Sequence, residues 1–166
     1  MLHPLILKTL LLQFVLTWIA PGTPGKALNH HARRLICLNA TRIIDGDTFE
    51  GRNKDSTFRI RLNAIDAPER GHDFYQVSKK RLGDLCEDGP LDVTLISKDR
   101  YGRWIADVSN KSHVLINYKL VEEGMAWFYK KYSRDTALAT LEETARLRKT
   151  GLWNNDNPVA PWLLRK

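Results

Sequence analysis

The stretch that decides the fold is residues 57–65, which read TFRIRLNAI. Apolar and polar side chains alternate through most of it, which is the period of a β-strand with one buried face. The apolar face holds Phe58, Ile60, Leu62 and Ala64. Arg61 falls on the opposite face, away from the side chains that would form a core. The stretch therefore predicts one strand that presents an arginine on its polar face.

Segments on both sides of this strand complete a small mixed fold. Four further segments have the apolar content and length of strands, namely residues 35–44, 48–52, 91–96 and 104–108. Three segments have the composition of helices, namely residues 74–86, 114–123 and 136–149. The last two are followed by Gly124 and Gly151, which favour helix termination. Five strands with helices interleaved late in the chain fit an α+β fold built on a small closed barrel.

The C-terminal region is rich in tryptophan and proline. It contains Trp153, Pro158, Pro161 and Trp162. We expect residues 153–162 to form a clasp that packs on the barrel. Ligand binding by the two tryptophans is the less favoured alternative.

Composition sets outer bounds on the class of protein. The 166 residues are 43% hydrophobic and 27% charged, which is ordinary for a globular chain with a single core. Lys and Arg number 26 against 19 Asp and Glu, giving a net charge of +7, the sign expected of a protein that meets polyanions. The five histidines form no H-E-x-x-H pattern and there is no C-x-x-C pair, so a histidine-based or zinc-based site is disfavoured.

The N-terminal region has the pattern of an export signal. An uncharged apolar run covers residues 9–20 and is followed by the proline- and glycine-rich residues 21–25. The run is shorter than the roughly 20 residues needed to span a bilayer. We expect residues 1–27 to be a signal peptide cleaved after Ala27, leaving a mature domain of residues 28–166 that is periplasmic or secreted. The alternative is an uncleaved anchor.

Two cysteines, Cys37 and Cys86, leave two possibilities open. An even count in an exported chain is compatible with a disulfide, which would close a loop of about 50 residues and add on the order of 4 kcal/mol on a chain-entropy account. Two free thiols are equally compatible with the sequence.

Three short clusters combine carboxylates with arginines. They are Asp45-Gly46-Asp47-Thr48, residues 61–69 (RLNAIDAPE) and residues 99–103 (DRYGR). Carboxylate oxygens are the natural ligands of Ca²⁺ or Mg²⁺. The planar guanidinium of arginine, here called its fork, can donate two parallel hydrogen bonds to the oxygens of a phosphate. Each cluster alone is more often a simple turn or strand end. Their conjunction in this order predicts a site that holds a hard cation against a phosphodiester.

The ordered clusters resemble those of the staphylococcal nuclease (thermonuclease) family, and the likeness runs from about residue 35 to the C-terminus. The resemblance implies an OB-fold five-stranded β-barrel with three α-helices. It also implies an exported, Ca²⁺-dependent endonuclease that cleaves single-stranded and double-stranded DNA and RNA with little sequence preference, leaving 3′-phosphate ends. A monomer without membrane association in the mature form is the matching expectation.

The resemblance also assigns metal ligands residue by residue. Asp47 and Asp66 match the metal-binding carboxylates, and the backbone carbonyl of Ala67 matches a further ligand. Oxygen-only ligation is compatible with Mg²⁺ or Mn²⁺ as well as Ca²⁺. Asp45 matches a position near the metal without a settled role.

The remaining roles concern the reaction and the substrate. Glu69 matches the general base, and Arg61 and Arg103 match the arginines that clamp the phosphate. Lysine in place of Arg61 is expected to remove most activity while keeping the fold, because an ammonium cannot replace a bidentate fork.

Four residues are candidates for substrate binding. Tyr101, Tyr129 and Tyr132 could stack on bases, and Arg100 could follow the phosphate backbone. Core packing is an equally good interpretation of the tyrosines.

A rival interpretation is an OB-fold nucleic-acid-binding module that has lost catalysis. Such a relative is expected to lack at least one of the five central residues. All five are present, namely Asp47, Arg61, Asp66, Glu69 and Arg103. The sequence therefore favours an enzyme.

Overall fold

Five strands close into a barrel in the computed structural model, which describes residues 33–165 of the chain. The barrel strands are β1 (Arg34–Ile43), β2 (Thr48–Arg52), β3 (Thr57–Leu62), β5 (Leu91–Lys98) and β6 (Trp104–Ser109). They join in the order β1-β2-β3-β6-β5, with β3 and β6 parallel and the other neighbouring pairs antiparallel. The predicted five-stranded barrel of an α+β OB-fold is confirmed.

The barrel interior is filled by alternate side chains of its strands. Leu38, Phe49, Ile60, Leu91 and Val93 are each no more than 1% exposed. Burial of a side chain of this size contributes about 1.5–3 kcal/mol each, so these residues hold the barrel closed. The alternation of residues 57–65 thus sets the core, as predicted.

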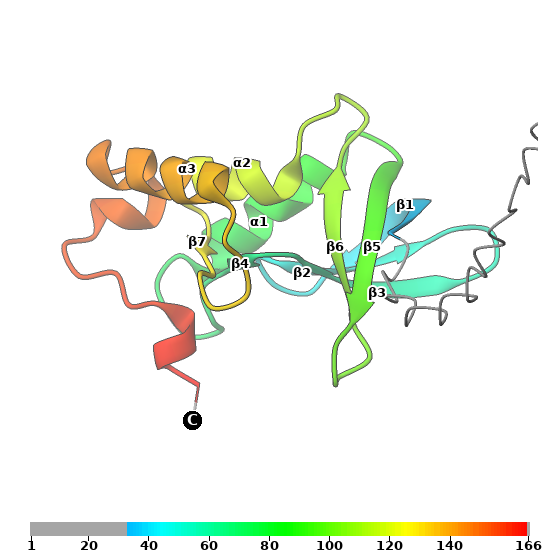
Figure 1. Cartoon of the computed structure of the whole chain (residues 1–166), viewed down its shortest axis with the longest axis horizontal. Helices are drawn as coiled ribbons and strands as arrows, with labels where there is room; N and C mark the ends of the chain where they lie inside the picture. Colours follow the sequence, from blue (N-terminus) through cyan, green and yellow to red (C-terminus); the bar gives the residue numbers. More distant parts are fainter. Residues whose placement is uncertain (1–32, 166) are drawn as a thin grey trace, which may run out of the picture. The chain divides into compact units, whose positions relative to one another are not determined.

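Three helices within residues 33–165 lie to one side of the barrel (Figure 1). They are α1 (Tyr75–Cys86), α2 (Ile116–Glu122) and α3 (Thr136–Leu147). The apolar stripe of α2 enters the main core, with Ile116, Leu120 and Val121 fully buried. Asp135 is the N-cap of α3, and its side chain accepts hydrogen bonds from the backbone N–H groups of Ala137 and Leu138.

The strand predicted over residues 57–65 is broken, contrary to expectation. β3 ends at Leu62, and Ile65–Asp66 form a separate strand, β4. Between them Ala64 has φ 62°, a left-handed conformation that no strand allows. β4 pairs with the short strand β7 (Trp127–Phe128), which the sequence did not indicate. The break matters because it removes Asp66 from the barrel sheet.

The predicted helix boundaries need small corrections. The helix expected at 74–86 begins at Tyr75, with Phe74 as its N-cap. The helix expected at 114–123 begins at Ile116, and that expected at 136–149 ends at Leu147.

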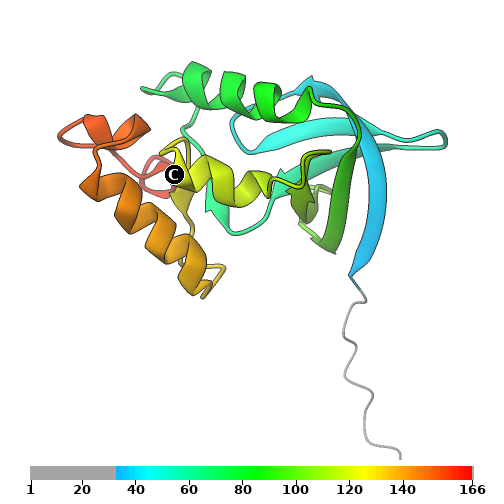
Figure 2. The ribbon, with the colours of Figure 1, turned by 90° about the horizontal axis from the view of Figure 1, so that it is seen from above.

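The C-terminal clasp packs on a second core, and the prediction that it packs on the barrel was wrong. This core consists of Trp127, Ala145, Leu152 and Trp153. The rings of Trp127 and Trp153 meet edge to face with centroids 5.4 Å apart. The chain then runs through the 3₁₀ turns η1 (Gly151–Asn154) and η2 (Pro161–Leu163). Figure 2 shows α3 and this C-terminal segment on the side of α2 away from the barrel strands.

Two glycines allow the end of α2 to meet η1 backbone to backbone. Gly124 and Gly151 have φ 63° and 59°, and a Cβ on Gly151 would lie 2.8 Å from the carbonyl carbon of Gly124. The N–H of Leu152 donates to the Gly124 carbonyl at 2.9 Å. A side chain at either position would separate the second core from α2.

Replacing Gly46 by alanine is expected to destabilise the fold by about 1–3 kcal/mol. A Cβ there would overlap the Ser78 hydroxyl of α1 and lie 2.8 Å from Ala67 Cβ. Urea denaturation measures the change. Gly83→Ala in α1 is the matched control, because its nearest neighbour would be Ile43 Cγ1 at 3.7 Å and alanine favours the helix. Equal stability of the two variants would contradict this view of the turn.

Both cysteines are free thiols, so the structure does not support the disulfide alternative. Cys37 is exposed on β1, and Cys86 is 5% exposed at the end of α1. Burial, with a smaller contribution from the Glu87 charge, raises the pKa of Cys86 to about 12.

The two thiols are therefore expected to differ in reactivity. A thiol reagent at pH 8 should label Cys37 at once and Cys86 only after unfolding, since the thiolate is the reactive form. Cys37→Ser should abolish the fast phase. Absence of any fast phase in the wild-type protein would contradict the assignment.

No helix among residues 33–165 is long and apolar enough to cross a membrane. The signal peptide expected over residues 1–27 lies outside the described residues, as does the alternative of an uncleaved anchor. Both remain predictions.

Candidate active site

Two aspartates and an arginine meet where the barrel joins the small β4–β7 sheet. Asp47 ends the turn before β2, Arg61 lies on β3, and Asp66 lies on β4. Arg61 is paired in register with Thr48, and the N–H of Leu62 donates to the Asp47 carbonyl at 2.8 Å. The barrel register therefore fixes the distance between the turn and the arginine.

Arg61 is buried between the two carboxylates. Its Nε lies 3.0 Å from Asp47 Oδ1, and its Nη2 lies 2.8 Å from Asp66 Oδ1. Its Nη1 donates to the carbonyls of Leu62 and Ile65 at 2.6 and 2.7 Å. All three nitrogens thus contact protein oxygens, and the residue is 8% exposed. An arginine on the polar face of a strand is here part of a buried ion-pair network.

Asp47 is held in one orientation by its neighbours. Its Oδ2 accepts the N–H of Ala67 at 2.7 Å, and its Oδ1 accepts the Thr48 hydroxyl at 2.9 Å. The N–H of Asp47 in turn donates to Asp45 Oδ1 at 3.0 Å. The predicted metal residues 47 and 67 are therefore in direct contact.

Asp66 is completely buried, yet one of its oxygens has no partner among residues 33–165. Oδ1 accepts from Arg61 and also from Arg165, whose Nη2 lies 2.6 Å away. Oδ2 has no hydrogen bond within the described part of the chain. An unsatisfied buried carboxylate oxygen is costly, so a missing partner is expected at this position.

Asp45 and Asp66 both have a raised pKa. Burial and the nearby Asp47 charge raise the pKa of Asp66, while Arg61 and Arg165 oppose the shift. Burial and the Asp47 charge likewise raise the pKa of Asp45 to about 6. Such clustered negative charge favours a cation between the acids.

The predicted oxygen donors fit a divalent cation. Two carboxylates and one backbone carbonyl supply only hard ligands, as Ca²⁺ and Mg²⁺ prefer. The unpartnered Asp66 Oδ2 is an available ligand atom. Residues 33–165 hold no cluster of three or more His, Cys, Asp or Glu side chains placed to bind a metal, so water or substrate oxygens would complete the shell.

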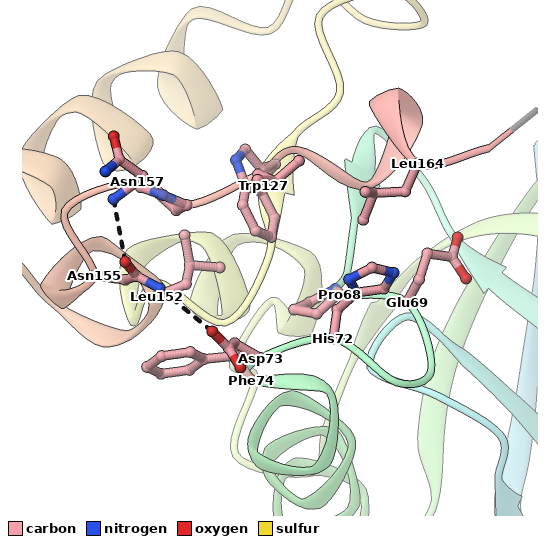
Figure 3. A pocket seen from close by; sticks show the side chains of 12 residues that line it. Pro68, Glu69, His72, Asp73, Phe74, Trp127, Leu152, Asn155, Asn157 and Leu164 are labelled. Atoms are coloured by element: carbon pink, nitrogen blue, oxygen red, sulfur yellow. Dashed lines mark hydrogen bonds between the residues drawn. The ribbon is translucent and has the colours of Figure 1, made fainter.

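Glu69 stands at the mouth of the site. Its side chain is 40% exposed, and its Oε1 lies 2.6 Å from Arg165 Nε. It also lines a cavity of about 90 Å³. Figure 3 shows Glu69 and His72 on one wall of this cavity and Leu164 of the C-terminal segment on another.

Arg103 is positioned by its own hairpin. Asp99 Oδ1 accepts the N–H groups of Tyr101 and Arg103, and Asp99 Oδ2 accepts Arg103 Nε at 2.8 Å. Arg61 pairs in register with Ile105 on the parallel strand β6, so Arg103 precedes that partner by two residues. Within residues 33–165, Arg103 forms its ion pair with Asp99 and none with the buried aspartates.

The candidate substrate residues fall into two groups. Tyr101 is 66% exposed at the tip of the β5–β6 hairpin, with the guanidinium of Arg100 4.8 Å from its ring centroid. Tyr129 follows β7, and its N–H donates to the Ala64 carbonyl at 2.8 Å, beside β4. Tyr132 is 68% exposed and meets Tyr129 edge to face at 4.7 Å.

Sequence reasoning missed the contribution of the C-terminal segment to this site. Trp162 stacks on Tyr129 with ring centroids 4.9 Å apart and planes 8° from parallel. Arg165 contacts both Asp66 and Glu69. Nothing in the local pattern of residues 161–165 distinguishes this arginine from a basic chain end.

Comparisons with known proteins show what this chain is similar to. A family model described as "Staphylococcal nuclease homologue" matches residues 59–155. An "Uncharacterized endonuclease" of Escherichia coli O157:H7 is 34% identical over 155 residues, covering 93% of this chain and 94% of that protein. A "Micrococcal nuclease" of Shigella flexneri is 37% identical over 135 residues, covering 75% of this chain and 78% of that protein. An "Uncharacterized endonuclease" of Haemophilus influenzae is 37% identical over 131 residues, covering 78% and 73%.

Proposed function

Because the chain belongs to the staphylococcal nuclease family, we propose that it is a Ca²⁺-dependent endonuclease that hydrolyses DNA and RNA with little sequence preference and leaves 3′-phosphate ends. The relatives named endonuclease and micrococcal nuclease support nuclease activity. The observation that supports metal dependence is the buried Asp66, whose Oδ2 has no partner among the described residues. The Arg61 guanidinium links this aspartate to Asp47.

Asp47, Asp66 and the carbonyl of Ala67 would hold the ion. When bound, a divalent cation polarises a phosphoryl oxygen and offsets the charge that develops at phosphorus. The protein keeps the two aspartates at a fixed separation through Arg61 and through the Ala67 N–H. This preorganisation spares the site a rearrangement during the reaction.

Glu69 would accept a proton from the attacking water. Its exposed position beside Pro68, at the edge of the cavity, lets water reach the carboxylate. Arg165 occupies Oε1, so Oε2 is the oxygen that would take the proton.

The two predicted clamp arginines would contribute differently. Within residues 33–165 the Arg103 guanidinium forms a hydrogen bond only through Nε, to Asp99, and lies 5.5 Å from the centroid of the Tyr101 ring. Its two terminal nitrogens can therefore engage phosphate oxygens. Arg61 has all three nitrogens on protein oxygens, so we assign it mainly to positioning the aspartates.

Substrate contacts would come from exposed residues of the β5–β6 hairpin and of the segment after β7. Tyr101 and Arg100 are available on the hairpin tip, and Tyr132 is exposed after β7. Tyr129 is flanked by Trp162 and Tyr132, which leaves it less free to stack on a base than the sequence suggested. Export of the enzyme as a monomer remains part of the proposal and depends on the expected leader.

A binding module without catalysis is the alternative function. The experiment is incubation of the purified protein with single-stranded DNA, double-stranded DNA and RNA in Ca²⁺, with product ends analysed before and after phosphatase treatment. Products whose mobility changes with phosphatase and that cannot be extended by a polymerase beforehand support the proposal. Binding without any cleavage in Ca²⁺, Mg²⁺ or Mn²⁺ would establish the alternative.

A further inference from the structure

Arg165, in the C-terminal segment, contacts two carboxylates to which we assign different functions. Arg165 Nη2 lies 2.6 Å from Asp66 Oδ1, and its Nε lies 2.6 Å from Glu69 Oε1. One side chain therefore bridges a candidate metal ligand and the candidate general base. The same side chain remains 44% exposed, so it lies at the entrance of the site.

Specific packing brings Arg165 to this place. Trp162 stacks on Tyr129, and Pro161 is buried. The N–H of Leu164 donates to the Pro161 carbonyl at 3.1 Å, and Leu164 lines the cavity beside Glu69. The N–H of Tyr129 donates to the Ala64 carbonyl next to β4. The C-terminal segment is therefore anchored, through Tyr129, to the strand that carries Asp66.

The contacts of Arg165 bear on both functions assigned to its partners. Arg165 engages Glu69 through Oε1, so Oε2 is the oxygen that would take a proton from water. The charges of Asp47, Asp66 and Glu69 sum to −3, and those of Arg61 and Arg165 sum to +2. A divalent cation at the aspartates would make the charge of Arg165 surplus.

A phosphodiester would offer Arg165 a new partner. Its Nη1 forms no hydrogen bond among the described residues, and a planar fork suits two phosphate oxygens. Arg61 cannot serve in the same way because its nitrogens are engaged within the protein. Arg165 therefore adds a guanidinium beside the aspartates to the one that Arg103 offers from its hairpin.

We propose that Arg165 is a substrate-binding residue whose guanidinium binds a phosphate of the substrate beside Asp66 and Glu69, and whose charge opposes the binding of a divalent cation at the aspartates. The inference rests on the proposed function. It adds the C-terminal segment to the substrate site and predicts opposite effects of Arg165 on the binding of metal and of nucleic acid.

The test compares two variants of Arg165 in the full chain. Arg165→Gln removes the charge, Arg165→Lys keeps the charge but not the fork, and Arg148→Gln removes one charge from the C-cap of α3 as a control. Calorimetry measures Ca²⁺ binding without nucleic acid. Fluorescence anisotropy in Ca²⁺ measures binding of a labelled, cleavage-resistant phosphorothioate oligonucleotide, so neither readout depends on turnover.

Arg165→Gln is expected to tighten Ca²⁺ binding about tenfold, because a neighbouring positive charge is removed. It is expected to weaken oligonucleotide binding about 10- to 100-fold. Arg165→Lys should keep Ca²⁺ affinity near that of the wild type and still weaken oligonucleotide binding, while Arg148→Gln should change neither strongly. Thermal unfolding confirms that each variant is folded.

Three results would overturn the inference. Unchanged oligonucleotide binding with tighter Ca²⁺ binding would make Arg165 only a blocking group. Weaker Ca²⁺ binding in Arg165→Gln would make it a support for Asp66. No change in Ca²⁺ binding or in oligonucleotide binding would mean that the contacts of Arg165 with Asp66 and Glu69 serve neither function. Failure of the proposed function is separate, because it would appear as absence of cleavage by the wild-type protein.

Discussion

Arg61→Lys is expected to lower the free energy of unfolding by about 3–5 kcal/mol and to abolish cleavage. The guanidinium contacts Asp47, Asp66 and two carbonyls through three different nitrogens. A single ammonium cannot reach all four oxygens, so at least one buried acid loses its ion pair with residue 61. Breaking one side of a buried ion pair costs this much because the remaining charge is left uncompensated.

Urea denaturation of Arg61→Lys measures this loss, and Arg59→Lys is the matched control. Arg59 lies on the same strand, is 50% exposed and contacts only Glu50 at 3.0 Å. The control is expected to change stability by less than about 0.5 kcal/mol. Equal stability of the two variants would contradict the central position of Arg61.

This expectation replaces the one drawn from sequence, in which lysine at position 61 spared the fold. The alternation of residues 57–65 places Arg61 off the apolar face, and that is compatible with solvent exposure. Only the structure shows that the opposite face is covered by Asp66, after the chain reverses at Ala64.

Glu69→Gln is expected to reduce kcat by about 10²- to 10⁴-fold, the usual contribution of a general base. Calcium affinity and stability should change little, because Glu69 is exposed and is not assigned as a ligand. The amide oxygen can still accept from Arg165, so the C-terminal segment should stay in place.

Steady-state kinetics at saturating Ca²⁺ measure the loss. Glu143→Gln, on an exposed position of α3, removes the same charge outside the site and should leave kcat unchanged. A reduction of kcat below tenfold in Glu69→Gln would remove Glu69 from the role of base.

The barrel could be predicted because its strands carry a period-2 pattern of large apolar residues such as Phe49 and Ile60, both fully buried. β4 and β7 could not, because two-residue strands leave no periodicity to detect. The clasp was placed on the wrong core because tryptophans at 153 and 162 indicate burial without indicating a partner.

Asp47, Asp66 and Arg61 could be identified from the sequence, whereas Arg165 could not. Asp47 and Asp66 occupy short motifs, and the structure brings them to a shared arginine. Arg165 lies 99 residues from Asp66 in sequence, and its contact depends on the packing of Trp162 on Tyr129. Such a contact follows from tertiary structure alone.

The most direct measurement is cleavage of a labelled single-stranded oligonucleotide, first in chelator and then with Ca²⁺ in excess, by the wild-type protein and by Asp66→Asn. The wild-type protein is predicted to be inactive in chelator and active once Ca²⁺ is restored, while Asp66→Asn stays inactive in both although folded. Cleavage in chelator, or cleavage by Asp66→Asn at the wild-type rate, would contradict a cation site built on the buried aspartates.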